Sequence, residues 1–350
     1  TMTFIIHWNG TSWSQVPSPN PGSTENVLNG IAGVAADNLW AVGIHRSVSS
    51  GPVNLVLRYN GTSWQEVPSV PNPGTLGNSL DEVTLASPDE LWAVGWQNDS
   101  GSIREGLVLR LDIAGGTWTL IQTPTSGAHS PLHDVAAIAP GQVWAVGEYA
   151  AGSGAITWRC NTVSCTDIAS PGEVLYGVTA VDKTLAWAVG RDDNNQAVII
   201  RWDGTTSLWS IDPNGPPGFS STLYAVDALS PTHAWAVGNY APTSGADFDN
   251  LIQWYSNICP GSQQAKYKTN SLPGDIGGGA GGPGDWLVGL DLLLAVVIVA
   301  VAGAGFSIAF SISRPSRGIM VAQLAQDKRP APVRNAPGAI PVRIVRASRR

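Results

Sequence analysis

The chain repeats one short apolar motif at long intervals. "WAVG" stands at residues 40–43, 92–95, 144–147, 187–190 and 235–238, and successive tryptophans are 52, 52, 43 and 48 residues apart. Such intervals match the length of a four-stranded propeller blade and exceed what a helical hairpin repeat needs. The repeat therefore restricts the fold more than any other feature of the sequence.

Each repeat contains four short apolar runs separated by turn residues. The first repeat has "LNGIAGVAA" (28–36) before the motif and "LVLRYNGTSWQEV" (55–67) after it, with Asn-Gly between two strand-like runs. Asn-Gly accepts the positive φ that a tight hairpin turn requires. We therefore predict an all-β protein, a five-bladed β-propeller of four-stranded antiparallel blades within residues 1–259.

The connections differ in length in a regular way. The links from first to second strands and from third to fourth strands are short, whereas residues 44–54, 68–79 and 96–106 form long connections of the other kind. In an antiparallel blade the two kinds lie on opposite faces, so we expect any recognition surface on the face with the long connections.

The ends of the repeat region suggest how the propeller closes. Residues 3–16 resemble a third and a fourth strand, and the last repeat stops after "LIQWY" (251–255) without a fourth strand. We predict that residues 12–17 complete the fifth blade.

The pattern "HWNGTSW…VPSPNPG…LNGIAGVAADNLWAVG" resembles the WAVG-type repeats of bacterial surface β-propellers, which are distant relatives of kelch and Asp-box propellers. The resemblance covers about residues 4–255, and "GGTW" (115–118) is similar to the hairpin element of the Asp box, although the Asp and Ser of that box are not kept. It implies a fold rather than a function.

The 15 tryptophans could suggest a sugar-binding protein, but most of them recur at fixed positions of the repeat. A large side chain at a recurring position is expected to pack between blades. Trp96, Trp158 and Trp286 are outside this pattern. Four arginines also recur at one position of the third strand and so cannot converge on one substrate: Arg58, Arg110, Arg159 and Arg201.

Two of the three cysteines flank one hairpin turn. "RCNTVSCTD" (159–167) replaces "RYNGTSWQE", which predicts a disulfide between Cys160 and Cys165 and an oxidising compartment. The alternative, a metal site, lacks further ligands of suitable spacing. Cys259 has no local partner, and we expect neither a metal nor a cofactor.

A candidate ligand site lies at the start of the first strand of each repeat. The residue after the leading Leu differs from repeat to repeat and is mostly polar: Asn29, Asp81, His133, Tyr176 and Tyr224. Varied polar groups on a repeated frame are typical of a site around the mouth of a central channel. The alternative is an ordinary channel lining solvated by water. The acidic turns 191–195 and 247–250 could hold Ca²⁺ or simply be solvated.

The composition changes after the repeats. Residues 260–285 form a Gly-rich linker, and Leu292 to Ile312 run 21 residues without a charge, so we predict a transmembrane helix within 286–313. The tail, 314–350, carries nine Arg and Lys against one Asp, a net charge of +8. Basic flanks stay in the cytoplasm, which predicts a single-pass protein of the cell membrane with the propeller outside and the C-terminus inside.

The predicted helix has small residues four positions apart, which would let another helix pack closely: Ala300 with Ala304, and Gly303 with Ser307. The first residues, "TMTFIIHW", contain no export signal, so we expect one to have been removed or to lie outside the sequence.

These features favour a membrane-anchored extracytoplasmic propeller that acts as a protein-interaction or scaffold module, an accessory subunit of a larger membrane complex. The expected partners are other membrane-protein subunits, bound through the helix and the propeller loops, and membrane lipids, but not nucleic acid. The alternative is a cell-surface receptor for a ligand or glycan. A glycoside hydrolase is weaker, because no pair of carboxylates stands in a recognisable motif, and we expect no enzyme.

Overall fold

The computed structural model describes most of the repeat region and four short strands beyond it. The described residues are 1–9, 12–99, 101, 103–124, 129–149, 154–212, 220–244, 248–256, 294–300, 306–312, 321–324 and 342–345. In them the protein is all-β with antiparallel sheets, as the repeat predicts. The linker 260–285, Cys259 and Trp286 lie outside the described residues.

Each WAVG repeat forms one antiparallel sheet, and the motif always lies in the second strand. The first sheet consists of β3 (Glu25–Ala35), β4 (Asn38–Arg46), β5 (Val53–Tyr59) and β6 (Trp64–Glu66). The second consists of β7 (Gly77–Ser87), β8 (Glu90–Asn98), β9 (Glu105–Asp112) and β10 (Thr117–Leu120).

The next sheets keep this order. The third contains β11 (Leu132–Ala139), β12 (Gln142–Glu148), β13 (Ala155–Asn161) and β14 (Cys165–Asp167), and the fourth β15 (Val174–Asp182), β16 (Leu185–Arg191), β17 (Ala197–Asp203) and β18 (Leu208–Ile211). One bridge, Glu148 to Val174, joins these two sheets. The fifth has three strands, β19 (Ser220–Ser230), β20 (His233–Ala241) and β21 (Asp249–Ser256).

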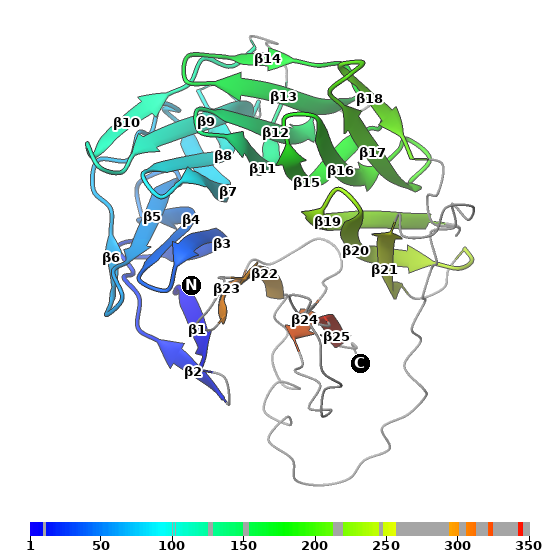
Figure 1. Cartoon of the computed structure of the whole chain (residues 1–350). Helices are drawn as coiled ribbons and strands as arrows, with labels where there is room; N and C mark the ends of the chain where they lie inside the picture. The colour runs from blue at the N-terminus through cyan, green and yellow to red at the C-terminus, as the bar shows by residue number, and fades with distance from the viewer. Residues whose placement is uncertain are drawn as a thin grey trace, which may run out of the picture.

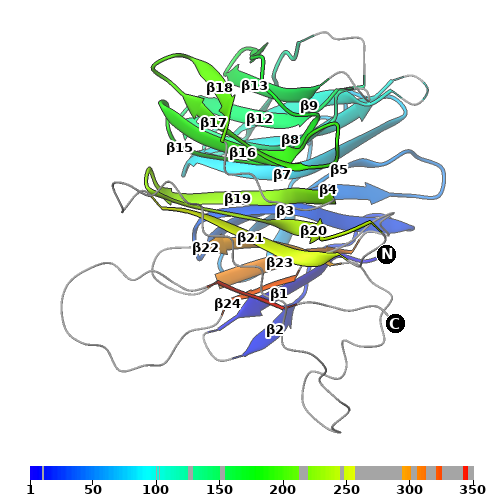
Figure 2. The same ribbon diagram turned by 90° about the vertical axis from the view of Figure 1, so that its right-hand side faces the viewer.

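The sheets follow one another around an arc. Figure 1 shows the first strands β3, β7, β11, β15 and β19 on the inside of this arc and the fourth strands on the outside. In Figure 2 the strands of successive sheets run in the same general direction, so connections of one kind gather at each end. We call the end with residues 47–52, 67–76, 99, 101, 103 and 104 the long-loop face.

The WAVG motif packs each sheet onto the next. The tryptophans of the first four motifs are at most 2% exposed. Trp40, for example, lies in one apolar cluster with Leu80 and Val83 of the following sheet, and Trp92 lies in another with Val135 and Val143. Trp235 of the last motif, which no further WAVG sheet follows in the chain, is 42% exposed. The prediction that these tryptophans are structural is confirmed for the first four.

The glycine of the motif has a separate role. A Cβ on Gly43, Gly95, Gly147, Gly190 or Gly238 would overlap a carbonyl oxygen of the neighbouring first strand or, for Gly147, of Pro131 directly before that strand. At this point the first strand contains a β-bulge, in which one extra residue displaces the backbone toward the second strand. Only glycine leaves room for that approach.

The tight turns are stabilised by their asparagines. Asn60 Oδ1 accepts hydrogen bonds from the backbone N–H groups of Thr62 and Ser63, each at 3.0 Å, and Gly61 has a φ of +90°. Asn161 Oδ1 accepts from Val163 and Ser164 in the same way. These contacts explain the Asn-Gly and Asn-Thr pairs as turn residues.

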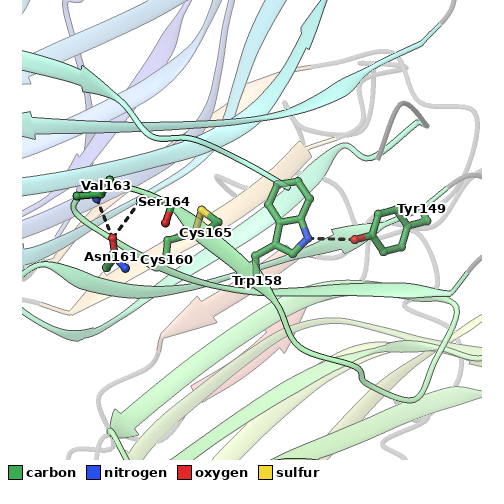
Figure 3. The surroundings of a disulfide bond; sticks show 7 residues. All are labelled: Tyr149, Trp158, Cys160, Asn161, Val163, Ser164 and Cys165. Carbon is green, nitrogen blue, oxygen red and sulfur yellow. Dashed lines mark hydrogen bonds between the residues drawn. A yellow bond between two sulfur atoms is a disulfide. The ribbon is translucent and has the colours of Figure 1, made fainter. Parts of the chain in front are cut away.

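The predicted disulfide between Cys160 and Cys165 is present and joins directly opposed residues of β13 and β14 (Figure 3). In the first and fourth sheets this cross-strand position holds aromatic pairs, Tyr59 with Trp64 and Trp202 with Trp209, whose ring centroids are 5.4 and 5.8 Å apart. The disulfide therefore takes the place of an aromatic contact. Trp158, which the sequence left outside the pattern, is fully buried beside it and donates a 3.2 Å hydrogen bond to Tyr149 Oη.

The prediction that residues 12–17 complete the fifth blade is wrong. β1 (Phe4–Trp8) pairs with β2 (Trp13–Val16), as expected of a third and a fourth strand, but the free edge of β1 pairs with β23 (Phe306–Ile312) and not with the fifth sheet. β22 (Leu294–Ala300) completes the order β2-β1-β23-β22. An unpaired strand edge needs hydrogen-bond partners, and here the C-terminal strands supply them.

The structure also differs from the expected membrane helix. Residues 294–300 and 306–312 form β22 and β23, and the described part of the chain contains no helix that is long and apolar enough to cross a bilayer. Val296, Val297, Ile298 and Val299 are β-branched, which favours extended backbone. Ala300 and Ser307 lie in these strands, whereas Gly303 and Ala304 lie outside the described residues. In the tail, β24 (Val321–Leu324) pairs with β25 (Val342–Val345).

Candidate recognition site on the inner strands

The five candidate residues occupy one structural position. Asn29, Asp81, His133, Tyr176 and Tyr224 are each the extra residue of the bulge in the first strand of their sheet. Each bulge lies opposite the glycine of a WAVG motif, so the motif that builds the fold also places the candidate residue. We call these five residues the bulge arc.

One half of the bulge arc is polar and hydrogen-bonded. Asn29 Nδ2 donates to the carbonyl oxygen of Leu80 at 2.9 Å and lies 3.5 Å from Asp81 Oδ1. Ser79 Oγ donates to the same carboxylate oxygen at 2.5 Å. Burial raises the pKa of Asp81, and the hydrogen bond from Ser79 offsets part of that rise.

The other half of the bulge arc is aromatic. The ring centroids of His133 and Tyr176 are 5.3 Å apart, and those of Tyr176 and Tyr224 are 5.4 Å apart. In both pairs the two ring planes are tilted relative to each other. His133 Nε2 lies 3.8 Å from Glu148 Oε1, and this contact holds the pKa of Glu148 below its usual value. The structure thus brings the predicted residues together as a series of neighbours.

Sequence reasoning missed two carboxylates directly after the bulges. Glu82 accepts hydrogen bonds from the backbone N–H groups of Val83 and, in the preceding sheet, Ile31. Asp134 accepts from Val135 and, in the following sheet, from Val178, both at 2.7 Å. Both side chains therefore connect neighbouring sheets. The sequence signal that could have identified them is an acidic residue directly after the variable position.

Burial dominates the titration of these two carboxylates. It raises the pKa of Asp134 to about 7, even though two backbone N–H groups favour its ionised form. Burial together with the nearby Asp134 raises the pKa of Glu82 well above its usual value. The inner strands therefore hold crowded acidic groups beside the bulge arc.

Buried amides fix the connections that lead into the first strands. Asn26 Oδ1 accepts from Gly22 N–H at 2.7 Å, and Asn26 Nδ2 donates to Gly22 O at 2.8 Å. Asn78 makes the same two contacts with Gly74, both at 2.8 Å. A sequence signal for these contacts was available: both loops contain "PNPG", and an Asn follows four residues after its glycine. Each of these loops is therefore fixed by hydrogen bonds to a buried asparagine.

Trp96 lies on the long-loop face, in the position after the second WAVG motif. The Arg104 guanidinium lies over its ring, 4.3 Å from the centroid, and Arg104 N–H donates to His129 Nδ1 at 3.3 Å. This arrangement leaves Trp96 partly exposed. Of Trp96 and Trp158, the two such tryptophans among the described residues, Trp96 is therefore the accessible one.

The four arginines of the third strands do not converge, as predicted. Each lies opposite a WAVG tryptophan in the strand register. Arg58 and Arg159 lie over the rings of Trp40 and Trp144, whereas Arg110 Nε pairs with Glu90 Oε1 at 2.5 Å. Over the described ranges, no three His, Cys, Asp or Glu side chains come together as metal ligands.

No protein-family model and no curated protein matches the chain. Among solved structures, the chain is similar to "Structure of U3-55K", with 13% identity, a TM-score of 0.49, and coverage of 73% of this chain and 71% of that one. It is also similar to "YCF48 from Cyanidioschyzon merolae", with 13% identity, a TM-score of 0.42, and coverage of 83% of this chain and 97% of that one. The fold assignment itself rests on the strand order and register described above.

Proposed function

We propose that the protein is an interaction module that binds a partner through the long-loop face and the bulge arc. The observation that carries this proposal is the meeting of five residues of four different types at equivalent bulges of a rigid repeated frame. Tyr176, Tyr224 and the stacked Trp96–Arg104 pair are the residue types that dominate binding energy at protein interfaces.

The rigidity of the loops supports the same proposal. Leu76 and Ile103 are 53% and 40% exposed on connections of the long-loop face. The connection of Leu76 is anchored by the Asn78 amide and by a 2.8 Å hydrogen bond from Thr75 N–H to Asp99 Oδ1. Apolar side chains on preorganised loops bind with a smaller loss of conformational entropy.

The test compares two faces of the same protein by cross-linking and mass spectrometry in its native cells. Leu76→Glu with Arg104→Glu should abolish cross-links that the wild type forms with a partner. Val163→Glu with Leu208→Glu, both exposed on the opposite face, is the matched control and should keep them. Identical cross-links for both double variants would refute an interface on the long-loop face.

We further propose that the protein is located outside the cytoplasm and attached to a membrane through residues 286–313, as an accessory subunit of a membrane complex. The disulfide supports an oxidising compartment, and the 21 uncharged residues support the attachment. The proposal competes with the pairing of β23 and β1, because one segment cannot form both structures. Retention in the membrane pellet after carbonate extraction supports the anchor, and release contradicts it.

A glycan receptor is the second candidate. The Tyr176 and Tyr224 rings could support the apolar face of a sugar, and Asn29 and Asp81 nearby offer polar groups. A glycan array probed with the wild type and with Tyr224→Ala tests it. A glycan signal that the variant loses favours the receptor, and no signal above background removes this candidate. We propose no enzymatic role.

A further inference from the structure

The titratable groups beside the aromatic half of the bulge arc are mostly acidic. Asp81, Glu82, Asp134 and Glu148 lie on the inner halves of the second and third sheets, and Asp227 of the fifth sheet is close enough to Asp134 to affect its titration. The nearby Arg104 and Arg191 are already engaged. Arg104 lies over Trp96, and Arg191 Nη1 donates to Asn195 Oδ1 at 3.1 Å.

We propose that the bulge arc binds a basic side chain, Arg or Lys, presented by a segment of a protein partner, between the tyrosine pair and the surrounding carboxylates. This inference rests on the proposed function and adds the chemistry of the partner. A cation over a tyrosine ring is attracted by the negative face of the ring, and neighbouring carboxylates strengthen the attraction in a partly desolvated place.

The tyrosine rings supply evidence independent of the acidic groups. Tyr224 is 37% exposed and in contact with Tyr176, and no hydrogen bond to either hydroxyl is found among the described residues. Buried or half-buried tyrosines normally place the hydroxyl on a partner. The Tyr224 ring therefore presents an exposed aromatic surface beside the half-buried ring of Tyr176.

The same chain already uses this kind of contact. The guanidinium groups of Arg58, Arg104 and Arg159 lie 5.0, 4.3 and 5.8 Å from the centroids of tryptophan rings. The carboxyl groups also favour a cation in another way. Burial and the nearby Asp134 raise the pKa of Glu82, and burial and the nearby Asp227 raise the pKa of Asp134, so a bound positive charge would favour the ionised form of both groups.

The test measures binding of fluorescent peptides to the full-length chain by anisotropy. The probes are an arginine-rich hexapeptide, a glutamate-rich hexapeptide and a neutral Ser-Gly hexapeptide. We expect the arginine peptide to bind best and to weaken with added salt, since its ion pairs are screened. Tyr224→Leu should reduce its affinity about 3- to 30-fold, the range that a cation–aromatic contact supplies.

Charge variants make the test specific. Asp227→Asn should weaken arginine-peptide binding, whereas Asp89→Asn, the same change at an exposed turn of the opposite face, should not. Thermal unfolding of each variant confirms that it is folded. Equal binding of the arginine and glutamate peptides, or equal losses in Asp227→Asn and Asp89→Asn, would overturn the proposal.

The outcome is separable from that of the proposed function. If partner cross-links survive Tyr224→Leu but disappear with Leu76→Glu and Arg104→Glu, the interaction module is supported and the basic ligand is rejected. If Tyr224→Leu loses arginine-peptide binding but no partner cross-links depend on the long-loop face, the basic-ligand site is supported and the interaction module is rejected.

Discussion

At the scale of single residues, the glycine of WAVG connects fold and site. Its missing side chain lets the bulge of the first strand approach, and the bulge in turn places a variable residue on the inside of the arc. The glycine is therefore required for the position of the candidate residue as much as for the sheet.

The first prediction follows from this contact. Gly147→Ala would force a methyl group into the carbonyl oxygen of Pro131, so we expect a loss of about 1–3 kcal/mol of unfolding free energy. Gly116→Ala is the control, because a Cβ there meets no atom within 4 Å and only the positive φ of 63° resists it. Urea denaturation of both variants measures the difference, and equal losses would contradict the account.

The second prediction concerns pH. The pKa of Asp134 is raised to about 7 in the folded protein, against 3.8 for the ordinary group, so the folded state holds the proton more tightly. Stability gained from this carboxyl is therefore present below pH 4 and is lost as the pH rises toward and through 7. Urea denaturation at pH 5, 6, 7 and 8 should show stability falling with pH.

Asp134→Asn provides the comparison for that experiment. Its amide cannot ionise, and its carbonyl oxygen can still accept from Val135 or Val178. We expect a shallower dependence on pH than in the wild type, whatever the absolute stability. The same slope in both proteins would assign the pH dependence to other groups, with Glu82 as the next candidate.

At the scale of the element, the third sheet shows two chemical solutions to one structural requirement. Its hairpin between β13 and β14 is closed by a disulfide, where the first and fourth sheets use an aromatic pair. Cys160 and Cys165 are also buried in the apolar cluster that receives Trp92. The bond therefore fastens the outer strand to the packed face of the sheet.

Removing the bond should weaken this sheet. For the loop of six residues that it closes, both cysteines included, the chain-entropy relation gives about 2 kcal/mol, so Cys160→Ala with Cys165→Ala should lose roughly that amount. Cys160→Tyr with Cys165→Trp recreates the pair of the first sheet and should recover part of the loss. Thermal melts with and without reductant give the comparison; if reductant leaves the wild type unchanged, the bond contributes nothing to stability.

Local patterns predicted these elements well for a physical reason. The WAVG strands, the tight turns at Asn60 and the disulfide depend on neighbours within one repeat, so their signals lie close together in the sequence. The bulge arc was found for a related reason, because the repeat register aligned its members. Glu82 and Asp134 were missed because their partners, Ile31 and Val178, belong to adjacent sheets.

At the scale of the whole molecule, the pairing of the two chain ends is what sequence reasoning could not supply. β1 needs a partner on its free edge, but nothing in residues 4–8 specifies which distant strand provides it. The run from Leu292 to Ile312 is equally ambiguous. Its 21 uncharged residues are long enough for a membrane helix, whereas the β-branched residues from Val296 to Val299 within it suit a strand.

A pair of engineered cysteines distinguishes the strand pairing from the membrane helix. Ile6 lies opposite Ile308 in the register, so Ile6→Cys with Ile308→Cys should form a disulfide on mild oxidation if the strands pair. Ile6→Cys with Ile312→Cys, four residues along the same strand, is the control and should stay reduced. No bond in the first variant, together with carbonate-resistant membrane retention, would favour the anchor.

The amide anchors of Asn26 and Asn78 have a consequence for how such proteins change over time. They hold the entries to β3 and β7 without any contribution from the residue at the bulge. Mutations at the bulge can therefore accumulate without loosening the loop that leads to it. A repeat built in this way allows new specificities to evolve one sheet at a time on an unchanged frame.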